Sequence, residues 1–502
     1  MHHYTLFLVL ALSSALTVFA QETVYVASDG GIFGTGSRLD PYGSIEVALD
    51  NVSAGDTIFV RGGTYTAPNS IRIDKSGDEN AYLFIWAYPG ETAVFDFTGA
   101  PRGFDIRGSY LHLKGLVAEK AEDNGIYVKQ ASYNIIEQAI ARLNGDSGIQ
   151  VEDGSAYNLL LNVDSYSNYD AGNNGENADG FAIKFGVGPG NVLHGCRAWG
   201  NSDDGYDFWS RDDSTHNGVT VENSWAFRNG LNVWDAPGFQ GDSNGFKLGH
   251  GPGAHLLIGN AAWGHLAHGF DVNGNTSGVT LYNNTSILNG GTNFYFDHDQ
   301  NVQQAQAILR NNLSFGDVRM DQSIVDDISN SWNAGLPNIS AADFISINDT
   351  GTDGPRQEDG SLPDLDFLRL AAGSALIDTG IDLGLPYTGP GPDFGAFESD
   401  VESTSINNPP KSPIQPELSR IYPNPFNTTT RIIFEVHTTG PARLEIYDVL
   451  GRRVARLFDR VTTAGQYEAT WNPASNRLPG GIYFARIEAA GAAKVQRMVF
   501  IK

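Results

Sequence analysis

Four aspartates and one lysine stand at matching places in a repeat in the middle of this 502-residue chain. They lie in three short stretches, Asp179-Gly180-Phe181, Asn201-Ser202-Asp203-Asp204-Gly205-Tyr206-Asp207 and Asn244-Gly245-Phe246-Lys247-Leu248. Carboxylates that converge at one place repel each other unless a cation lies between them. The pattern therefore predicts a hard-cation site formed by Asp179, Asp203, Asp204 and Asp207, with the basic Lys247 beside it.

The repeat consists of two alternating patterns. A glycine followed by alternating apolar residues recurs at Gly125, Gly148, Gly180, Gly205, Gly245 and Gly269, and a β-prone run ending near Asn recurs at 135–144, 159–168, 192–201, 219–229 and 279–289. The period is 23 to 25 residues except at two longer gaps, which predict inserted loops within 148–180 and 205–245. Because no 3.6-residue helical signal accompanies these short strands, the sequence predicts an all-β fold, a parallel β-helix whose stacked coils share one core.

Alternation within the glycine pattern predicts side-chain directions. Residues one and three places after each glycine are apolar and must point inward, so the residue between them points outward. This outward column is Tyr127, Gln150, Ala182, Asp207, Lys247 and Asp271. Asp207 and Lys247 are therefore expected on adjacent coils, roughly 5 Å apart. Asp179 and Asp204, which precede their glycines, are expected in register in a second column.

A column of asparagines recurs near the ends of the β-prone runs, at Asn144, Asn168, Asn201, Asn229 and Asn289. Asparagine tolerates left-handed backbone, and stacked amides can bond from coil to coil. We expect these residues to be turn residues without a chemical role.

Composition restricts the function. The net charge of -26 argues against nucleic-acid binding and is compatible with cation binding, and an anionic substrate would need a metal to bridge it. Residues 1–20 are typical of a secretory signal peptide, with an apolar run over 6–19, so we expect a secreted, monomeric protein. Cys196, the only cysteine, falls at a small inward position and is expected to be a buried structural thiol.

The remaining chain divides by composition. Residues 21–400 are expected to form the β-helix, with 24–66 as its cap, a helix near 44–51, coils to about 320, and an irregular segment over 320–400 packed along the outside. Residues 401–418 have the composition of a linker. Alternating strands at 431–436, 443–447 and 481–487 predict a small β-sandwich over 419–502.

The chain resembles the family 9 polysaccharide lyases, which have a pectate-lyase-like right-handed parallel β-helix. The resemblance rests on the motif 178–182, on the run 190–199, on the motif 201–207 and on the motif 244–249. It implies that Asp179, Asp203, Asp204 and Asp207 bind Ca²⁺ and that Lys247 is the catalytic base. The implied reaction is β-elimination in an acidic plant-type polysaccharide, polygalacturonate, with loss of activity in chelator and an alkaline optimum.

Residues 421–502 resemble the C-terminal sorting domain of the type IX secretion pathway. The resemblance lies in Tyr422-Pro423-Asn424-Pro425-Phe426-Asn427, in the motif 446–451 and in Gly480-Gly481-Ile482-Tyr483. It implies recognition by the type IX secretion machinery, followed by cleavage or by anchoring at the cell surface.

Other residues near these motifs are weaker candidates. Substrate contacts are assigned to Lys184, which points outward four residues after Gly180, and to Arg197, Arg211 and Asp271. The aromatic residues Trp199, Trp209, Trp225, Phe227 and Trp234 are equally compatible with sugar stacking and with loop packing. The spacing of His250, His265 and His268 does not match a zinc motif, so they are interpreted as substrate-side or structural residues.

Three kinds of function remain open on the residues alone. One is a lyase, acting on polygalacturonate, rhamnogalacturonan or another uronate polymer. Another is a glycoside hydrolase on the same scaffold, which would need two carboxylates flanking the scissile bond. The last is a non-catalytic glycan-binding β-helix. The tight aspartate cluster beside a lysine favours the lyase.

Overall fold

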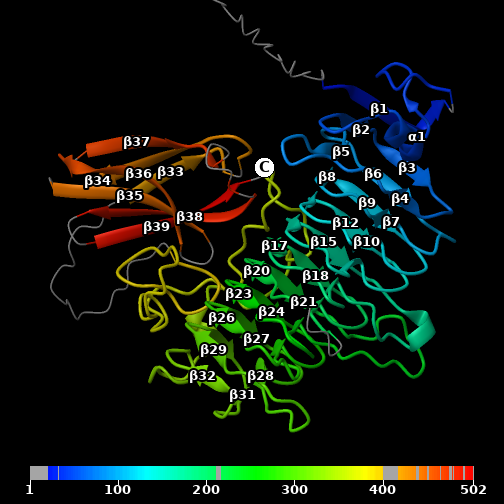
Figure 1. Cartoon of the computed structure of the whole chain (residues 1–502). Coiled ribbons are helices and arrows are strands. Elements are labelled where there is room, and N and C mark those ends of the chain that lie inside the picture. The colour runs from blue at the N-terminus through cyan, green and yellow to red at the C-terminus, as the bar shows by residue number, and fades with distance from the viewer. Residues whose placement is uncertain are drawn as a thin grey trace, which may run out of the picture.

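The computed structural model describes residues 21–31, 33–210 and 216–399, and residues 417–500 apart from gaps at 425, 437–439, 449–451, 464, 474–477, 479 and 490–491. Within these residues the chain forms three parallel sheets that make a β-helix, followed by two antiparallel sheets (Figure 1). The all-β prediction, a parallel β-helix followed by a small β domain, is confirmed.

Each coil of the β-helix contributes one strand to each of three sheets. Sheet I contains, in spatial order, β1 (Thr23–Gly31), β2 (Thr57–Val60), β5 (Leu83–Ala87), β8 (Leu111–Lys114), β11 (Ile135–Glu137), β14 (Leu159–Leu161), β17 (Val192–His194), β20 (Thr220–Glu222), β23 (Leu256–Ile258), β26 (Thr280–Tyr282), β29 (Ala307–Arg310) and β32 (Val325–Asp327). Sheet II contains β4 (Ile71–Ile73), β7 (Phe104–Ile106), β10 (Ile126–Lys129), β13 (Ile149–Glu152), β16 (Phe181–Ile183), β19 (Tyr206–Asp207), β22 (Phe246–Lys247), β25 (Phe270–Asp271), β28 (Phe294–Phe296) and β31 (Val318–Met320). Sheet III contains β3 (Gly63–Thr66), β6 (Ala93–Asp96), β9 (Leu116–Glu119), β12 (Ile140–Arg142), β15 (Asp164–Tyr166), β18 (Arg197–Trp199), β21 (Trp225–Phe227), β24 (Ala261–Trp263), β27 (Thr285–Ile287) and β30 (Leu313–Phe315).

The expected cap is built into the stack. Strands β1 and β3 from this segment are the first strands of sheets I and III, and helix α1 (Ile45–Asp50) lies at the N-terminal end of the coils (Figure 1). Ser44 caps the helix by accepting a hydrogen bond from the backbone of Val47. The helix buries Ile45, Ala48 and Leu49, so it covers apolar surface that the first coil would otherwise expose.

Aromatic rings fix the spacing of the coils behind sheet II. Phe181, Tyr206, Phe246, Phe270 and Phe294 stand one place after their glycines, or at the equivalent position, and all are fully buried. Their rings stack with centroids 4.5–4.9 Å apart. This matches the distance between neighbouring strands, so the sheet hydrogen bonds and the ring stack impose the same repeat.

Four of the five asparagines in the predicted column form a buried amide ladder, whereas Asn289 donates to Ser286 and Asn293 instead. Each side-chain amide donates to the oxygen of the next, from Asn144 to Asn168 at 2.9 Å, from Asn168 to Asn201 at 2.8 Å and from Asn201 to Asn229 at 3.0 Å. The expectation of left-handed backbone at these asparagines is wrong, because the preceding residues, Leu143, Ser167, Gly200, Arg228 and Leu288, have positive φ. The turn therefore places its left-handed residue one position earlier and leaves the asparagine side chain free to bond inward.

The irregular segment after the last coils packs on the outer face of sheet III, as expected. Phe344, Phe367, Leu370 and Phe394 bury themselves against Trp225, Phe227 and Trp263. The 3₁₀ turn η2 (Ala341–Asp343) begins this packing with a capping box at Ser340. Trp225 and Phe227 are therefore packing residues and not a sugar platform.

The C-terminal domain pairs antiparallel strands in two sheets. One contains β33 (Glu417–Tyr422), β34 (Thr430–Val436) and β37 (Gly465–Trp471), and the other β36 (Arg453–Thr462), β35 (Gly440–Asp448), β38 (Gly481–Ala489) and β39 (Ala492–Phe500). Arg497 on β39 contacts Glu222 and His194 on sheet I. This contact lies on a different sheet from the predicted cation site, which is on sheet II.

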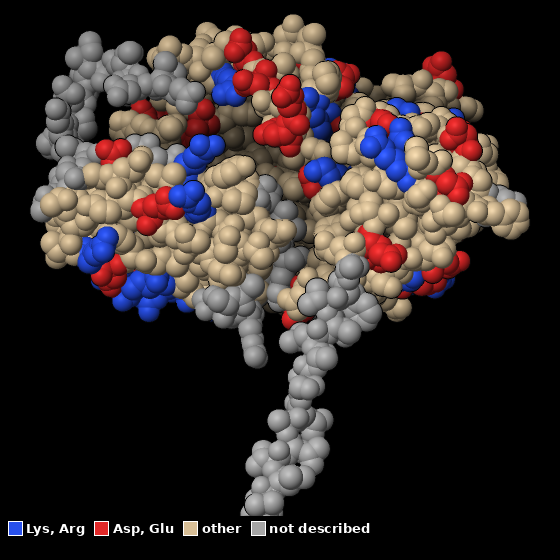
Figure 2. All heavy atoms as spheres, turned by 90° about the horizontal axis from the view of Figure 1, so that it is seen from above, with Lys and Arg blue, Asp and Glu red and all other residues tan. Residues whose placement is uncertain are grey.

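No helix among the described residues combines the length and apolar character needed to span a membrane. On the face shown in Figure 2, the described Lys and Arg side chains are scattered among Asp and Glu. Cys196 is buried in the core, and its burial raises the pKa of the thiol to about 12, as expected for a structural cysteine.

Candidate active site

The predicted outward column is aligned on sheet II. Ala182 pairs with Asp207, Asp207 with Lys247, and Lys247 with Asp271, on four successive coils. The predicted register of Asp207 and Lys247 is therefore confirmed. Their exposure differs from expectation, because Asp207 is only 3% and Lys247 only 7% exposed.

Two inserted loops explain this burial. The first loop carries the 3₁₀ turn η1 (Ala171–Asn173), and the backbone of Asn177 near its end donates to Asp203. The second loop, over 231–243, is tied to the first where Gln240 donates to Asn174, and its Trp234 stacks on Tyr169 at 4.6 Å. Together the two loops cover the carboxylates that lie just before strand β19 and within it.

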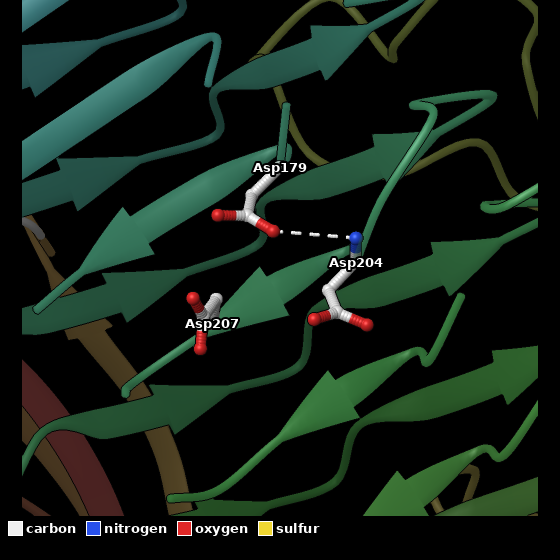
Figure 3. Close-up of side chains that lie close together, drawn as sticks. All are labelled: Asp179, Asp204 and Asp207. Carbon is white, nitrogen blue, oxygen red and sulfur yellow. Dashed lines mark hydrogen bonds between the residues drawn. The ribbon is translucent and has the colours of Figure 1, made fainter. Parts of the chain in front are cut away.

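Three predicted ligands converge from neighbouring coils. Asp179, Asp204 and Asp207 each place a carboxylate oxygen within 4.8 Å of the others, and all three are buried (Figure 3). The backbone N–H of Asp204 donates to Asp179 at 3.2 Å, which joins these two members of the second column on adjacent coils (Figure 3). A second group, formed by Asp203, Asp204 and Asp242, shares Asp204 with the first.

One oxygen of this cluster is buried without a hydrogen bond. Oδ1 of Asp204 accepts from the backbone of Asn244 at 2.7 Å and from its side chain at 3.0 Å. Oδ2 has no hydrogen-bond partner, although Lys247 Nζ lies 3.2 Å away. Buried carboxylate oxygens are the ligands that calcium prefers, and an unbonded one is costly unless a cation approaches it. The donor set therefore fits Ca²⁺.

The pKa values of the cluster show how poorly the protein alone accommodates its charge. Burial raises the pKa of Asp179 and of Asp204 well above the usual range, and it raises that of Asp203 as well. Burial also acts to raise the pKa of Asp207, but the neighbouring Lys184 and Lys247 outweigh it and hold this pKa below its usual value. A bound cation would relieve the same penalty.

Lys247 is held between two carboxylates. Its Nζ is 3.2 Å from Asp204 Oδ2 and 2.6 Å from Asp242 Oδ2. Burial acts to lower the pKa of Lys247, but Asp207, Asp204, Asp203 and Asp242 outweigh it and keep this pKa well above its ordinary value. Sequence reasoning missed Asp242, because it lies in an inserted loop and occupies no repeat position.

Lys184 also lies inside the cluster. Its Nζ donates to Asp179 at 3.0 Å and to Asp207 at 2.9 Å, and its side chain is 8% exposed. The ammonium is thus occupied by the predicted metal ligands. The expectation that Lys184 contacts substrate does not fit this placement.

Arg197 lies away from the cluster. It is on β18 of sheet III, where it donates to both oxygens of Asp164 and to the backbone of Thr352 and Gly354. All these partners belong to the protein and the side chain is 3% exposed, so Arg197 fastens the outer segment to the β-helix, and its donors are occupied. Arg211 falls outside the described residues.

Asp271 follows Lys247 in the column. Its carboxylate accepts from the backbone of Asn273 at 2.8 Å, and burial raises its pKa to about 6. It is the neighbour of the proposed base on the next coil and remains a candidate substrate contact.

Two of the histidines and Trp199 contact residues of neighbouring coils. His265 occupies a position of the asparagine ladder, and its Nδ1 accepts a hydrogen bond from the backbone N–H of Asn229 at 3.2 Å. His268 stacks on Tyr295 one coil beyond Lys247, at 4.2 Å. Trp199 stacks between Tyr166 and Phe227 on sheet III.

The sequence of residues 24–312 matches the family described as Pel9A-like, right handed beta helix region. The chain belongs to this family. Pectate lyase L of Dickeya dadantii is 40% identical over 405 residues, covering 77% of this chain and 93% of that protein. Pectate lyase PEL9 of Emericella nidulans is 34% identical, over 70% of this chain and 93% of the relative.

Solved structures agree with the family assignment. The crystal structure of pectate lyase Pel9A superposes with a TM-score of 0.70 at 38% identity, and covers 76% of this chain and 98% of its own. A rhamnogalacturonan lyase, at 24% identity and a TM-score of 0.57, shares the fold. The chain is a polysaccharide lyase.

Residues 420–502 match a secretion system C-terminal sorting domain. The protein is therefore secreted or located at the cell surface. Strand β33 begins at Glu417, shortly before the matched region.

Proposed function

We propose that this protein is a calcium-dependent pectate lyase in which Lys247 removes the C5 proton of a galacturonate unit. The observation that carries the proposal is the position of Lys247 Nζ, 3.2 Å from the unbonded oxygen of Asp204 at the edge of a buried carboxylate cluster. This position would place a proton acceptor next to a cation site, as abstraction of a proton next to a carboxylate requires. The similarity to pectate lyases supports the choice of polymer.

Asp179, Asp203, Asp204 and Asp207 would hold the calcium. When bound, Ca²⁺ supplies positive charge that offsets these carboxylates and stabilises the negative charge that develops on the uronate. Lys247 must be neutral to accept a proton, and the same carboxylates now hold its pKa well above its ordinary value, against the effect of burial. Activity should therefore require metal and increase toward alkaline pH.

Two contacts support this role for Lys247. Its register beside Asp207 places Nζ next to the carboxylate cluster, where a uronate carboxylate bound at the cluster would bring its C5 proton close to the neutral amine. Asp242 holds Nζ on the opposite side at 2.6 Å, which limits the rotamers of the long side chain. Elimination of the O4 substituent leaves a 4,5-unsaturated sugar.

The carboxylate spacing disfavours a hydrolase. Within each group, the ligand oxygens lie within 4.8 Å of one another. Retaining and inverting glycosidases separate their two carboxyl groups by about 5–5.5 Å and about 6.5–9.5 Å. Each group is thus tighter than either pair, which favours one shared cation over two carboxyl groups that flank a glycosidic bond.

The test is absorbance of unsaturated uronates with polygalacturonate, with calcium and with chelator. We expect a calcium-dependent rise in the wild type and in Lys129→Met, and a loss of at least about 1,000-fold in Lys247→Met. Lys129 occupies the same sheet, pairs with Glu152 at 2.9 Å and lies outside the cluster, so it controls for the loss of a lysine. Full activity in Lys247→Met would refute the base assignment, and a rise only on another uronate polymer would change the substrate.

We also propose the processing of the chain. Residues 1–20 would be removed as a signal peptide, and residues 419–502 would be recognised by the type IX secretion machinery through the matched sorting domain. The mature enzyme would act as a monomer. Mass spectrometry of the secreted protein would test both ends, since an intact N-terminus or retention in the periplasm would contradict the scheme.

A further inference from the structure

We propose that Lys184 is a built-in counter-cation that keeps the carboxylate cluster assembled without metal and limits how tightly the cluster binds calcium. The inference rests on the proposed function, since it concerns the same cation site. It goes beyond the proposed function by assigning a positioning role to Lys184, a buried residue outside the reacting atoms.

The geometry places Lys184 between ligands of different coils. Asp179 precedes strand β16 and Asp207 lies within strand β19, and the Lys184 ammonium bonds to Oδ2 of both, at 3.0 and 2.9 Å. The side chains of Lys184, Asp179 and Asp207 are 8%, 0% and 4% exposed, respectively. Solvent therefore cannot replace the ammonium, and removing it would leave two buried carboxylates facing each other.

The charge balance gives this contact a consequence for metal binding. Asp179, Asp203, Asp204 and Asp207 are all buried, and Lys184 and Lys247 are the buried ammoniums that bond to these carboxylates. When these six buried groups are ionised, two negative charges remain among them, apart from the charge of the exposed Asp242, and one divalent cation neutralises these two. Without Lys184 three negative charges would remain, and the attraction for a dication would be stronger.

A residue at the matching place of an earlier coil shows what Lys184 adds. Lys129 also stands four residues after a glycine of the repeat, and it bonds to Glu152 at 2.9 Å. It is 30% exposed and meets no group of converging aspartates. A lysine at this place is therefore compatible with the fold, and what distinguishes Lys184 is burial between two predicted ligands.

The experiment compares full-length wild type, Lys184→Met, Lys184→Gln and the control Lys129→Met by calorimetric titration with CaCl₂ and by thermal unfolding in chelator. We expect both Lys184 variants to melt several degrees lower than wild type without metal, because a buried pair has lost one partner. We expect them to bind calcium about tenfold more tightly or better, since a nearby unit of positive charge has been removed. Lys129→Met should bind calcium as the wild type does.

The outcomes separate the two proposals. Calcium binding in the wild type with unchanged or weaker binding in both Lys184 variants would overturn the counter-cation role and leave the calcium site intact. Absence of calcium binding in the wild type would overturn the proposed metal site and this inference together. Lys184→Gln loses the same charge as Lys184→Met but keeps a polar side chain. If only Lys184→Met folds poorly, Lys184→Gln still decides between these outcomes.

Discussion

Asp204→Asn should separate the stability of the metal-free protein from its response to calcium. The substitution keeps the size of the side chain and keeps Oδ1, which accepts both hydrogen bonds from Asn244. It removes the negative charge on the buried oxygen that has no hydrogen bond. Because burial raises the pKa of Asp204 well above its usual range, the ionised form costs stability as pH rises through that pKa. In chelator at pH 8 the variant should therefore melt no lower than the wild type.

Calcium should reverse this ranking. A ligand at 100 times its dissociation constant stabilises the folded state by about 2.7 kcal/mol. If loss of one carboxylate weakens binding about 100-fold, the same concentration contributes only about 0.4 kcal/mol. For a domain of about 380 residues, the unfolding entropy is about 0.8 kcal/mol per kelvin, so calcium should raise the Tm by about 3 °C in the wild type and by less than about 1 °C in the variant.

Differential scanning calorimetry in chelator and in calcium measures both quantities. Asp105→Asn is the matched control, because Asp105 lies on sheet II and pairs with Arg107 at 2.6 Å, outside the cluster. An unchanged calcium shift in Asp204→Asn would refute its assignment as a ligand. An equal loss in Asp105→Asn would show that the shift does not report the cluster.

Three further predictions follow from single residues. Burial raises the pKa of Asp271 to about 6, above its unfolded value of 3.8, so as pH rises from about 4 to about 6 the wild type should lose about 3 kcal/mol more stability than Asp271→Asn. Denaturant unfolding of both proteins in chelator measures this difference, and parallel pH profiles would contradict it. Asn201→Ala removes two hydrogen bonds of the amide ladder and leaves their buried partners unpaired. The free energy of unfolding in the same assay should therefore fall by about 2–4 kcal/mol. A loss below about 1 kcal/mol would mean that water replaces these hydrogen bonds. Trp234→Ala removes the ring that stacks on Tyr169 and thereby fastens the loop that carries Asp242. The kcat/KM should therefore fall about three- to tenfold, with little change in Tm. An unchanged kcat/KM would show that this loop does not position the site.

The register of the site was predictable because strands alternate with a period of two. Once the glycines were aligned, the apolar residues on either side of Asp207 and Lys247 determined both the face and the pairing of these two residues, and the structure shows the same pairs. The asparagine ladder was predictable for the same reason. Its backbone conformation was not, because the amide bonds require the asparagine itself to stay out of the left-handed region, which passes to Leu143 and Arg228.

The burial of the site could not be predicted from the repeat. The loops that enclose Asp207 have no counterpart in other coils, so neither their path nor the place of Asp242 follows from periodicity. Trp234 in the second loop stacks on Tyr169 of the first loop, and this contact joins two residues that are 65 positions apart in sequence. Such pairings depend on loop lengths, and the sequence offers no rule for them.

The partners of Lys184 and Arg197 could not be predicted from residue type alone. Both are basic residues close in sequence to the aspartate motifs, and both seemed suited to an anionic sugar by charge alone. Arg197 stands on sheet III, where Asp164 and two backbone carbonyls occupy its donors. Lys184 stands just after a strand of sheet II, where the nearest anions are the predicted metal ligands themselves. A cation in an acidic protein is therefore first a candidate partner for the protein's own carboxylates, and only the remaining exposed donors are candidates for substrate.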